Sequence, residues 1–278
     1  MKYLELNISI DDSEQAEIAV AYLADFPFDS FDEQESTLKA YIPAMEYDKC
    51  KEELSAMLEQ QAFQYEWQEV EQQNWNAEWE SGFEAVDVAG ERPIRIRAPH
   101  HQAPEQGVMD VVIAPRMSFG TGHHATTALM SQSIAELALE GKRGLDMGCG
   151  TGVLAIVAVK CGAKQMVAVD IDEWACDSCR DSITLSGVQE HVEVRCGSIE
   201  SVLEGEQFDF VVANINRNIL VSMMPRFGEL VCKGGELLCS GFLREDVVHI
   251  ESSARECGFE LVGDVERDGW VVVKCKRV

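Results

Sequence analysis

The amino-acid sequence predicts an α/β protein in which a small α+β domain precedes a doubly wound, mostly parallel sheet. Two observations support this prediction. Residues 1–70 alternate strand and helix patterns in the order βαββαβ, and from residue 119 onward helices alternate with short strands that are apolar on both faces. Strands of the second kind are typical of a parallel sheet that is covered by helices on both sides. We therefore expect at least two folded parts within the 278 residues.

The first domain is predicted from six patterns in residues 1–70. They are KYLELNISI as a strand, SEQAEIAVAYLAD as a helix, FDSFDEQ and TLKAYIP as strands, MEYDKCKEELSAMLEQQ as a helix and FQYEWQEVE as a strand. This order is that of a ferredoxin-like α/β sandwich, which is a self-sufficient small domain.

Residues 71–100 are predicted to form a linker helix and a connecting segment. In NWNAEWESGF, Trp75, Trp79 and Phe83 recur every four residues and so share one face of a short helix. We expect this face to pack between domains, with substrate stacking as the alternative. The β-like runs RPIRIRA and MDVVIAP, on either side of a polar loop with two histidines, predict a connecting hairpin.

Residues 101–278 form the second predicted domain. Its patterns are TTALMSQSIAELALE, RGLDMG, VLAIVAVKCG, QMVAVDI, ACDSCRDSITLSG, VEVRCG, FDFVVANI and ELLCSGF, in which strands and helices alternate. No internal repeat or low-complexity tract interrupts them.

Composition excludes several classes of protein. No window approaches the roughly 18 consecutive apolar residues of a membrane span, and the N-terminus has no signal-peptide pattern, so we expect a cytoplasmic protein. The net charge is −26, and residues 1–91 hold 23 acidic residues against 4 lysines. This acidity disfavours direct nucleic-acid binding and favours a basic protein partner, although solubility alone would also explain it. The ten cysteines are scattered through predicted helices and strands, which indicates reduced, buried thiols.

The stretch LDMGCGTGVLAIVAVKCGA, residues 145–163, predicts a ligand-binding turn. Gly148, Gly150 and Gly152 lie between a buried strand and a helix, where glycine allows a positive φ and a close approach of the ligand to the main chain. The next strand ends at Asp170, whose carboxylate can accept hydrogen bonds from both hydroxyls of a ribose. A nucleotide-like ligand is therefore expected.

The spacing of the glycines argues against a dinucleotide. The fingerprint G-x-G-x-x-G/A, begun at Gly148, requires glycine or alanine where the chain has Val153. The pattern D-x-G-x-G-x-G, which begins at Asp146, instead resembles motif I of class I S-adenosylmethionine-dependent methyltransferases. An acid before the turn suits a ligand with a cationic end, because Asp146 can reach a methionine ammonium directly or through water.

Two further segments carry candidate site residues. The loop FGTGHHATT, residues 119–127, opens a helix that Thr126 or Thr127 would cap. In VVANINRNIL, Asn214 ends a strand, where its amide oxygen can accept a hydrogen bond from a bound substrate; a turn-forming asparagine is the alternative. Metal binding by His123 and His124, or by the pair Cys176 and Cys179, lacks further ligands at suitable spacing, so no metal is expected.

Taken together, these motifs resemble one family, the bacterial ribosomal protein L11 methyltransferases (PrmA). The likeness includes the segment from Asn74 to Trp79, the loop FGTGHHATT, the motif LDMGCGTGVLAIVAVKCGA, VDID at residues 169–172, VVANI and the terminal GWVVVK. It implies a class I methyltransferase fold with an antiparallel C-terminal strand. It also implies binding of S-adenosylmethionine, with S-adenosylhomocysteine as product, by Phe119, Gly120, Thr121, Gly122, Thr127, Asp146, Gly148, Gly150, Asp170, Ile171 and Asn214, and it gives Asn214 the catalytic role.

The resemblance further implies methylation of amines of ribosomal protein L11, on lysine side chains or the N-terminal α-amine. The first domain then grips that substrate, and the enzyme is expected to be a monomer without membrane or direct nucleic-acid contacts. Three alternatives stay open at this point: a methyltransferase for another amine, a nucleotide-sensing module without catalysis, and an oxidoreductase that uses NAD.

Overall fold

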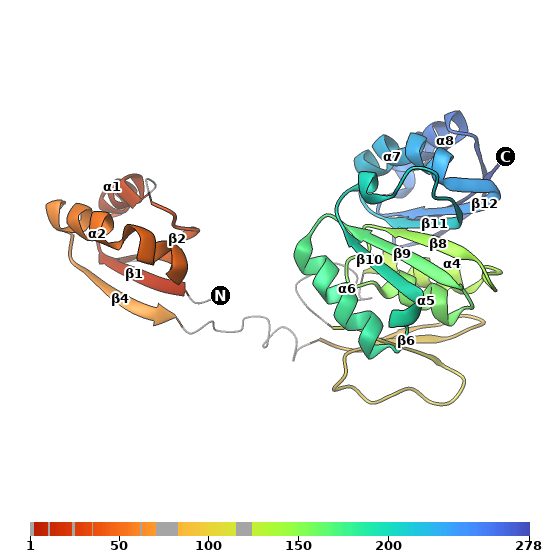
Figure 1. The fold of residues 1–278 in the computed structure, drawn as a ribbon, viewed down its shortest axis with the longest axis horizontal. Coiled ribbons are helices and arrows are strands. Elements are labelled where there is room, and N and C mark those ends of the chain that lie inside the picture. The colour runs from red at the N-terminus through yellow and green to blue at the C-terminus, as the bar shows by residue number, and fades with distance from the viewer. Residues whose placement is uncertain are drawn as a thin grey trace. The chain divides into compact units, whose positions relative to one another are not determined.

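The computed structural model describes residues 3–10, 12–23, 26–34, 36–61, 63–70, 83–114 and 124–278. The chain divides into two compact units, Met1–Ala77 and Glu78–Val278. Each unit is described by itself below (Figure 1). The domain boundaries at residues 70 and 100 remain predictions.

The first unit is a four-stranded antiparallel sheet with two helices on one face (Figure 1). Its strand order is β2-β3-β1-β4, and every neighbouring pair is antiparallel. Leu6 and Ile8 of the central strand pack in one core with Leu54 and Leu58 of the second helix, because alternate side chains of a strand share a face. This arrangement confirms the predicted βαββαβ sandwich. In chain order the elements are β1 (Tyr3–Ser9), α1 (Ser13–Leu23), β2 (Ser30–Gln34), β3 (Thr37–Pro43), α2 (Ala44–Gln60) and β4 (Tyr65–Val70).

The second unit is built on a seven-stranded sheet with the order β10-β9-β8-β11-β12-β14-β13. The first five strands of this order pair in parallel, and β14 is antiparallel to both of its neighbours. The mostly parallel sheet with an antiparallel C-terminal strand is thus confirmed. The elements are α4 (Ala125–Ala135), β8 (Arg143–Met147), α5 (Val153–Lys160), β9 (Gln165–Asp170), α6 (Glu173–Leu185), β10 (Val192–Cys196), β11 (Phe208–Asn214), α7 (Arg217–Leu230), β12 (Val231–Ser240), α8 (Val247–Glu256), β13 (Phe259–Arg267) and β14 (Trp270–Arg277).

Helices cover both faces of this sheet. Helices α4, α5 and α6 share one apolar core, and α7 and α8 share the other (Figure 1). Strand β11 divides its side chains between the two cores: Phe210 and Val212 enter the first, whereas Val211 and Ala213 enter the second. This explains why the strand is apolar without alternation. Strand order reverses at β8, which lies between β9 and β11, and ligands of such sheets bind beside this reversal.

Residues 86–112 form a three-stranded sheet in place of the predicted hairpin. Strand β5 (Val86–Val88) is antiparallel to β6 (Ile94–Arg97), but β6 is parallel to β7 (Met109–Val112). The hairpin prediction is therefore wrong. Alternate apolar residues of both runs lie in the α4–α5–α6 core. Such a pattern specifies which face of a strand is buried, but not the direction of the strand. Phe83 lies in the same core, while Trp75 and Trp79 fall outside the described residues.

Helix α6 satisfies main-chain groups along β7 through serine side chains one helical turn apart. Ser178 Oγ donates to Ala114 O at 3.1 Å, and Ala114 N donates to Ser182 Oγ at 2.9 Å. Ser186 Oγ accepts from Val112 N at 2.9 Å and donates to Val112 O at 2.8 Å. We call these three residues the serine ladder. The ladder supplies hydrogen bonds that a further strand would otherwise provide.

A cluster of ion pairs joins β8 and β10 to the loop before β11. Glu206 pairs with Arg143 and, at 2.6 Å, with Arg195 Nη1, and it accepts a hydrogen bond from Leu203 N at 2.9 Å. Its side chain is 15% exposed. The hydrogen bonds from Arg195 lower the pKa of Glu206 to about 2.

All ten cysteines are free thiols. Six are buried, as predicted, but Cys50, Cys232 and Cys257 are half-buried and Cys196 is exposed. No helix in the described part of the chain combines the length and the apolar character of a membrane span.

Candidate functional site

A cavity of about 590 Å³ opens at the carboxyl ends of β8, β9 and β11. Five residues predicted from the sequence line it together, namely Gly148, Gly150, Asp170, Ile171 and Asn214. The structure thus brings to one place residues that are up to 66 positions apart in the chain. The other lining residues are His124, Thr126, Met147, Asp172, Ala175, Ser198, Ile215, Asn216, Ile219, Met223, Gly241 and Trp270.

The turn after β8 depends on glycine for two reasons. Gly148, Gly150 and Gly152 have φ values of +75°, +52° and +78°, which L side chains rarely adopt. A Cβ on Gly148 would also collide with the side chain of Ile215, and one on Gly152 would approach Cys179 Sγ to 2.5 Å. Gly148 and Gly150 face the cavity, whereas the lack of a side chain at Gly152 serves the packing of α5 against α6.

Asp170 ends β9 and is held rigidly by the main chain. Its Oδ2 accepts a hydrogen bond from Gly150 N at 2.8 Å, and its Oδ1 accepts one from Asp172 N at 3.1 Å. Each carboxylate oxygen can accept a second hydrogen bond, so the pair can still receive two adjacent hydroxyls. Ile171 follows with 76% of its surface exposed and offers an apolar contact at the rim.

Asp146 lies in β8 and is fully buried. Its Oδ2 accepts a hydrogen bond from Ala155 N at 3.1 Å, but its Oδ1 has no partner among the described residues. Burial raises the pKa of this carboxyl to about 7, and the negative charge of Asp170 contributes to the shift. Asp146 does not itself line the cavity; the adjacent residues Met147 and Gly148 do. An unpaired buried oxygen is costly, so this position favours a cationic ligand group that would pair with it.

Asn214 ends β11 and lines the cavity. Its Oδ1 is buried and finds no donor in the parts of the chain that the structure describes. The alternative role of a turn-forming asparagine belongs instead to Asn216, which caps α7 by accepting a hydrogen bond from Ile219 N at 3.1 Å. The amide oxygen of Asn214 is therefore available to a ligand.

Comparison with known proteins identifies the family of this chain. A profile of the family described as ribosomal protein L11 methyltransferase (PrmA) matches residues 5–278. The chain belongs to this family. It is 37% identical over 265 residues to the ribosomal protein L11 methyltransferase of Porphyromonas gingivalis, covering 91% of this chain and 88% of that protein. The protein of the same name from Bacteroides fragilis is 37% identical over 279 residues, with 99% of each chain covered.

A solved structure described as ribosomal protein L11 methylase from Lactobacillus delbrueckii subsp. bulgaricus has the same fold. Its TM-score is 0.64 at 23% sequence identity, and the match covers 70% of this chain and 99% of that one. The family resemblance expected from the sequence is thus confirmed, and with it the methyltransferase fold.

Helix α4 of this L11 methyltransferase family member begins differently from the prediction. His124 is its N-cap: His124 Nδ1 accepts a hydrogen bond from Thr126 N at 3.3 Å and lies 2.8 Å from Thr126 Oγ1. The prediction that Thr126 or Thr127 caps the helix is wrong, because both lie inside its first turn. Thr126 reaches the cavity, whereas Thr127 is fully buried with its Oγ1 unpaired within the described structure.

Several predicted contacts of the loop before α4 cannot be placed. Phe119, Gly120, Thr121, Gly122 and His123 lie outside the described residues. Their contacts with a cofactor, like that of Thr127, stay predictions. Within the residues that are described, no group of three or more potential metal ligands occurs.

Trp270 is the main lining residue that the sequence reasoning missed. It begins β14, and its ring meets the ring of His124 edge-on, with the centroids 4.5 Å apart. The motif GWVVVK marked the segment without indicating a site. The sheet topology places Trp270 at the cavity. Strand β14 pairs with β12, and the last residue of β12, Ser240, lies in register with Asn214. Ser240 Oγ also donates a hydrogen bond to Val271 O, next to Trp270, at 2.8 Å.

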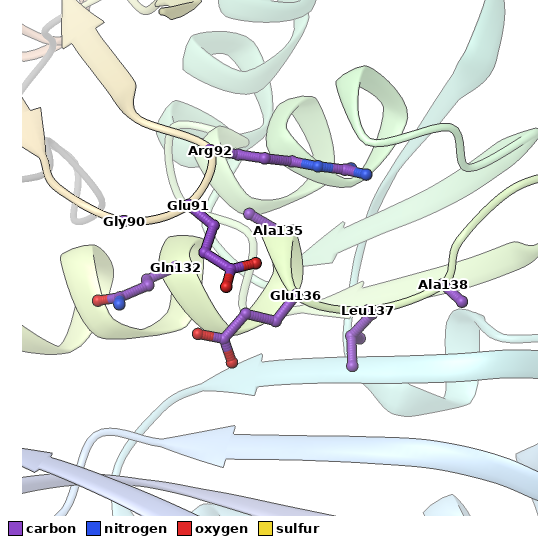
Figure 2. A pocket seen from close by; sticks show the side chains of 8 residues that line it. All are labelled: Gly90, Glu91, Arg92, Gln132, Ala135, Glu136, Leu137 and Ala138. Carbon is purple, nitrogen blue, oxygen red and sulfur yellow. The ribbon is translucent and has the colours of Figure 1, made fainter.

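A second cavity, of about 260 Å³, lies at the C-terminal end of α4 (Figure 2). In Figure 2 the carboxylates of Glu91 and Glu136 are directed toward the same space beside Gln132. Glu136 also accepts a hydrogen bond from Lys274 at 2.7 Å. None of the predicted site residues that the structure describes lines this cavity, so the candidate site is the one at the strand ends.

Proposed function

We propose that this protein transfers methyl groups from S-adenosylmethionine to amines of ribosomal protein L11. The observation that carries the proposal is the buried oxygen of Asn214, which has no partner among the described residues and lies in the same cavity as the ribose-type carboxylate of Asp170. A site that only binds a nucleotide has no need of such an acceptor beside it. The names of the family and of its relatives supply the substrate.

The residues fit the proposed methyl donor at both of its ends. Asp170 would receive the ribose hydroxyls, because its two oxygens are already oriented by Gly150 and Asp172. Asp146 would pair with the methionine ammonium, directly or through a water, because its buried Oδ1 has no partner in the described part of the chain. When bound, S-adenosylmethionine supplies a methyl group on a positively charged sulfur.

Asn214 would orient the incoming amine. Its Oδ1 can accept an N–H of a neutral amine, which directs the nitrogen lone pair toward the methyl group in line with the leaving sulfur. An amide, unlike a carboxylate, does not fix the amine as a cation. Freeing the lone pair of lysine at about pH 7.4 costs on the order of 4 kcal/mol, whereas an α-amine costs roughly half a kcal/mol. Desolvation in the cavity lowers the lysine cost, because burial disfavours the ammonium.

The first unit would bind the basic substrate by charge. Glu52, Glu53 and Glu59 are exposed on α2, and residues 1–77 carry 18 acidic side chains against 4 lysines. Such a surface attracts a lysine-bearing protein and speeds its encounter with the enzyme at low salt.

Radiolabelled S-adenosylmethionine tests the proposal. The full-length protein is incubated with the label and the separated proteins of a large ribosomal subunit, and we expect label in the L11 band alone. Label in another protein or in a small molecule would instead support a methyltransferase for a different amine. Absence of any transfer, together with absence of S-adenosylhomocysteine binding, would refute the proposal.

Charge reversal on α2 tests recruitment separately. The triple substitution of Glu52, Glu53 and Glu59 by lysine should raise KM for ribosomal protein L11 about tenfold while leaving S-adenosylhomocysteine affinity unchanged. The matched control replaces three exposed glutamates of the second unit, Glu190, Glu204 and Glu256, by lysine. An equal rise of KM in both variants would mean that net charge, rather than the first unit, recruits the substrate.

A further inference from the structure

The two cysteines of the C-x-x-C sequence in α6 each contact a different third cysteine. Cys176 and Cys179 are both fully buried. The Cys179 thiol packs against Gly152 and interacts with the thiol of Cys149 in the glycine turn. The Cys176 thiol donates a hydrogen bond to Asp170 O at 3.3 Å and interacts with the thiol of Cys196. Each α6 cysteine is thus matched with a cysteine near the end of a different strand.

The second of these pairs lies beside the candidate site. Cys196 is the last residue of β10 and lies in register with Asp170, the last residue of β9. Its thiol is 3.9 Å from Ile171 O, and both Asp170 and Ile171 line the cavity. The thiols of Cys176 and Cys196 therefore both contact main-chain oxygens of the segment that carries the Asp170 carboxylate.

Exposure distinguishes the two members of the pair. Cys196 is exposed, whereas Cys176 is buried beneath it. An exposed thiol reacts first with a dissolved oxidant, and a neighbouring thiol then resolves the product. By contrast, Cys149 and Cys179 are both buried, so a dissolved oxidant has no access to either.

We propose that hydrogen peroxide converts Cys176 and Cys196 into a reversible disulfide, and that this bond weakens binding of the methyl donor at the adjacent carboxylate. The second half of the proposal rests on the proposed function. In the first step the Cys196 thiol and one peroxide give a sulfenic acid and water. In the second step the sulfur of Cys176 attacks the sulfenic sulfur, its proton leaves with the displaced hydroxyl as water, and the disulfide forms. Two thiols are oxidised and one peroxide is reduced to two waters.

The geometry connects this bond to the site. A disulfide sulfur carries no proton, so Cys176 Sγ loses its hydrogen bond to Asp170 O when it forms a bond of about 2.05 Å to Cys196 Sγ. Cys176 lies in the first turn of α6, and the N-cap of that helix, Asp172, donates its N–H to Asp170 Oδ1. Movement of this turn therefore disturbs one of the two bonds that orient the carboxylate. Burial raises the pKa of the Cys176 thiol, so little of it is thiolate, and we expect the second step to be slow enough for the sulfenic acid on Cys196 to be trapped.

Peptide mapping of the full-length protein tests the chemistry. After peroxide treatment, free thiols are alkylated and the chain is cleaved on the N-terminal side of aspartates; cleavage before Asp177 separates Cys176 from Cys179. We expect a linked peptide pair that contains Cys176 and Cys196, lost on reduction, and dimedone labelling of Cys196 at early times. The variant Cys196→Ser should form no link, and Cys179→Ser should form it as the unmodified protein does. A link between Cys176 and Cys179, or oxidation of Cys196 without any link, would overturn the proposal.

Calorimetric titration with S-adenosylhomocysteine tests the consequence. The oxidised protein should bind about tenfold more weakly than the reduced protein, dithiothreitol should restore the affinity, and Cys196→Ser should be insensitive to peroxide. Equal affinity of the linked and reduced forms would refute the effect on the site. Failure of the reduced protein to bind, with the linked peptide still present, would instead contradict the proposed function and leave the disulfide established.

Discussion

The buried carboxyl of Asp146 should make binding of the proposed cofactor sensitive to pH. Desolvation is the main cause that raises the pKa of this carboxyl to about 7. An ammonium bound beside Asp146 Oδ1 would lower this pKa and keep the carboxylate ionised. Binding then requires loss of the proton from Asp146. With a pKa of about 7, S-adenosylhomocysteine should bind about tenfold more weakly at pH 6 than at pH 8, which corresponds to about 1.4 kcal/mol. The same arithmetic predicts release of about 0.9 proton per ligand bound at pH 6.

Calorimetry in buffers of different ionisation enthalpy measures both quantities. The control is Asp146→Asn, which keeps an acceptor for Ala155 N but cannot ionise; it should bind more weakly, with no dependence on pH and no proton release. The same pKa shift determines how the stability of the folded state depends on pH. A raised carboxyl pKa favours the folded state at low pH, and this contribution is lost as the pH rises from about 4 through about 7. Equal proton release by both proteins would refute the assignment of Asp146.

Three further outcomes are expected. Replacing Asn214 by alanine should lower kcat about 100-fold and change S-adenosylhomocysteine affinity less than about threefold, because the amide positions the amine; equal losses would make Asn214 a cofactor ligand only. Asp170→Ala should weaken S-adenosylhomocysteine binding about 100-fold through lost charged hydrogen bonds, whereas Glu136→Ala, in the second cavity, should leave it unchanged; unaltered affinity in Asp170→Ala would remove the ribose assignment. Glu206→Gln should cost about 2 kcal/mol of unfolding free energy at pH 7 after allowance for solvent screening, measured by urea. Because the pKa of Glu206 is lowered to about 2, this difference should disappear as the pH falls from about 4.5 to about 2, and a constant difference would contradict it.

The sequence predicted the parts of the site that follow from local pattern. Asp170 and Asn214 were found because each ends an apolar run, and parallel strands place their carboxyl ends at one edge of the sheet. The glycines were predicted because several glycines between a strand and a helix form a local sequence pattern. All three have positive φ in the structure. The ferredoxin-like order of the first unit was likewise readable, since its helices and strands differ clearly in period.

Features that depend on the tertiary fold were missed or wrong. The parallel pairing of β6 and β7 depends on packing against helices that follow later in the chain. His124 caps α4 although histidine is not a preferred capping residue, and Trp270 reaches the site only because β14 pairs beside β12. The raised pKa of Asp146 comes from complete burial, which its place in a motif does not reveal.

The serine ladder also imposes a length constraint on the fold. Four residues of helix advance about 6.0 Å, and two residues of strand advance about 6.6 Å, so Ser182 and Ser186 keep step with Ala114 and Val112, at and just beyond the end of β7. Deletion or insertion of one residue between Ser182 and Ser186 would rotate one hydroxyl by about 100° around the helix and leave main-chain groups of β7 without partners. The spacing of Ser182 and Ser186 is therefore tied to that of Ala114 and Val112, so a change of length between the two serines requires a matching change in the strand segment that they contact.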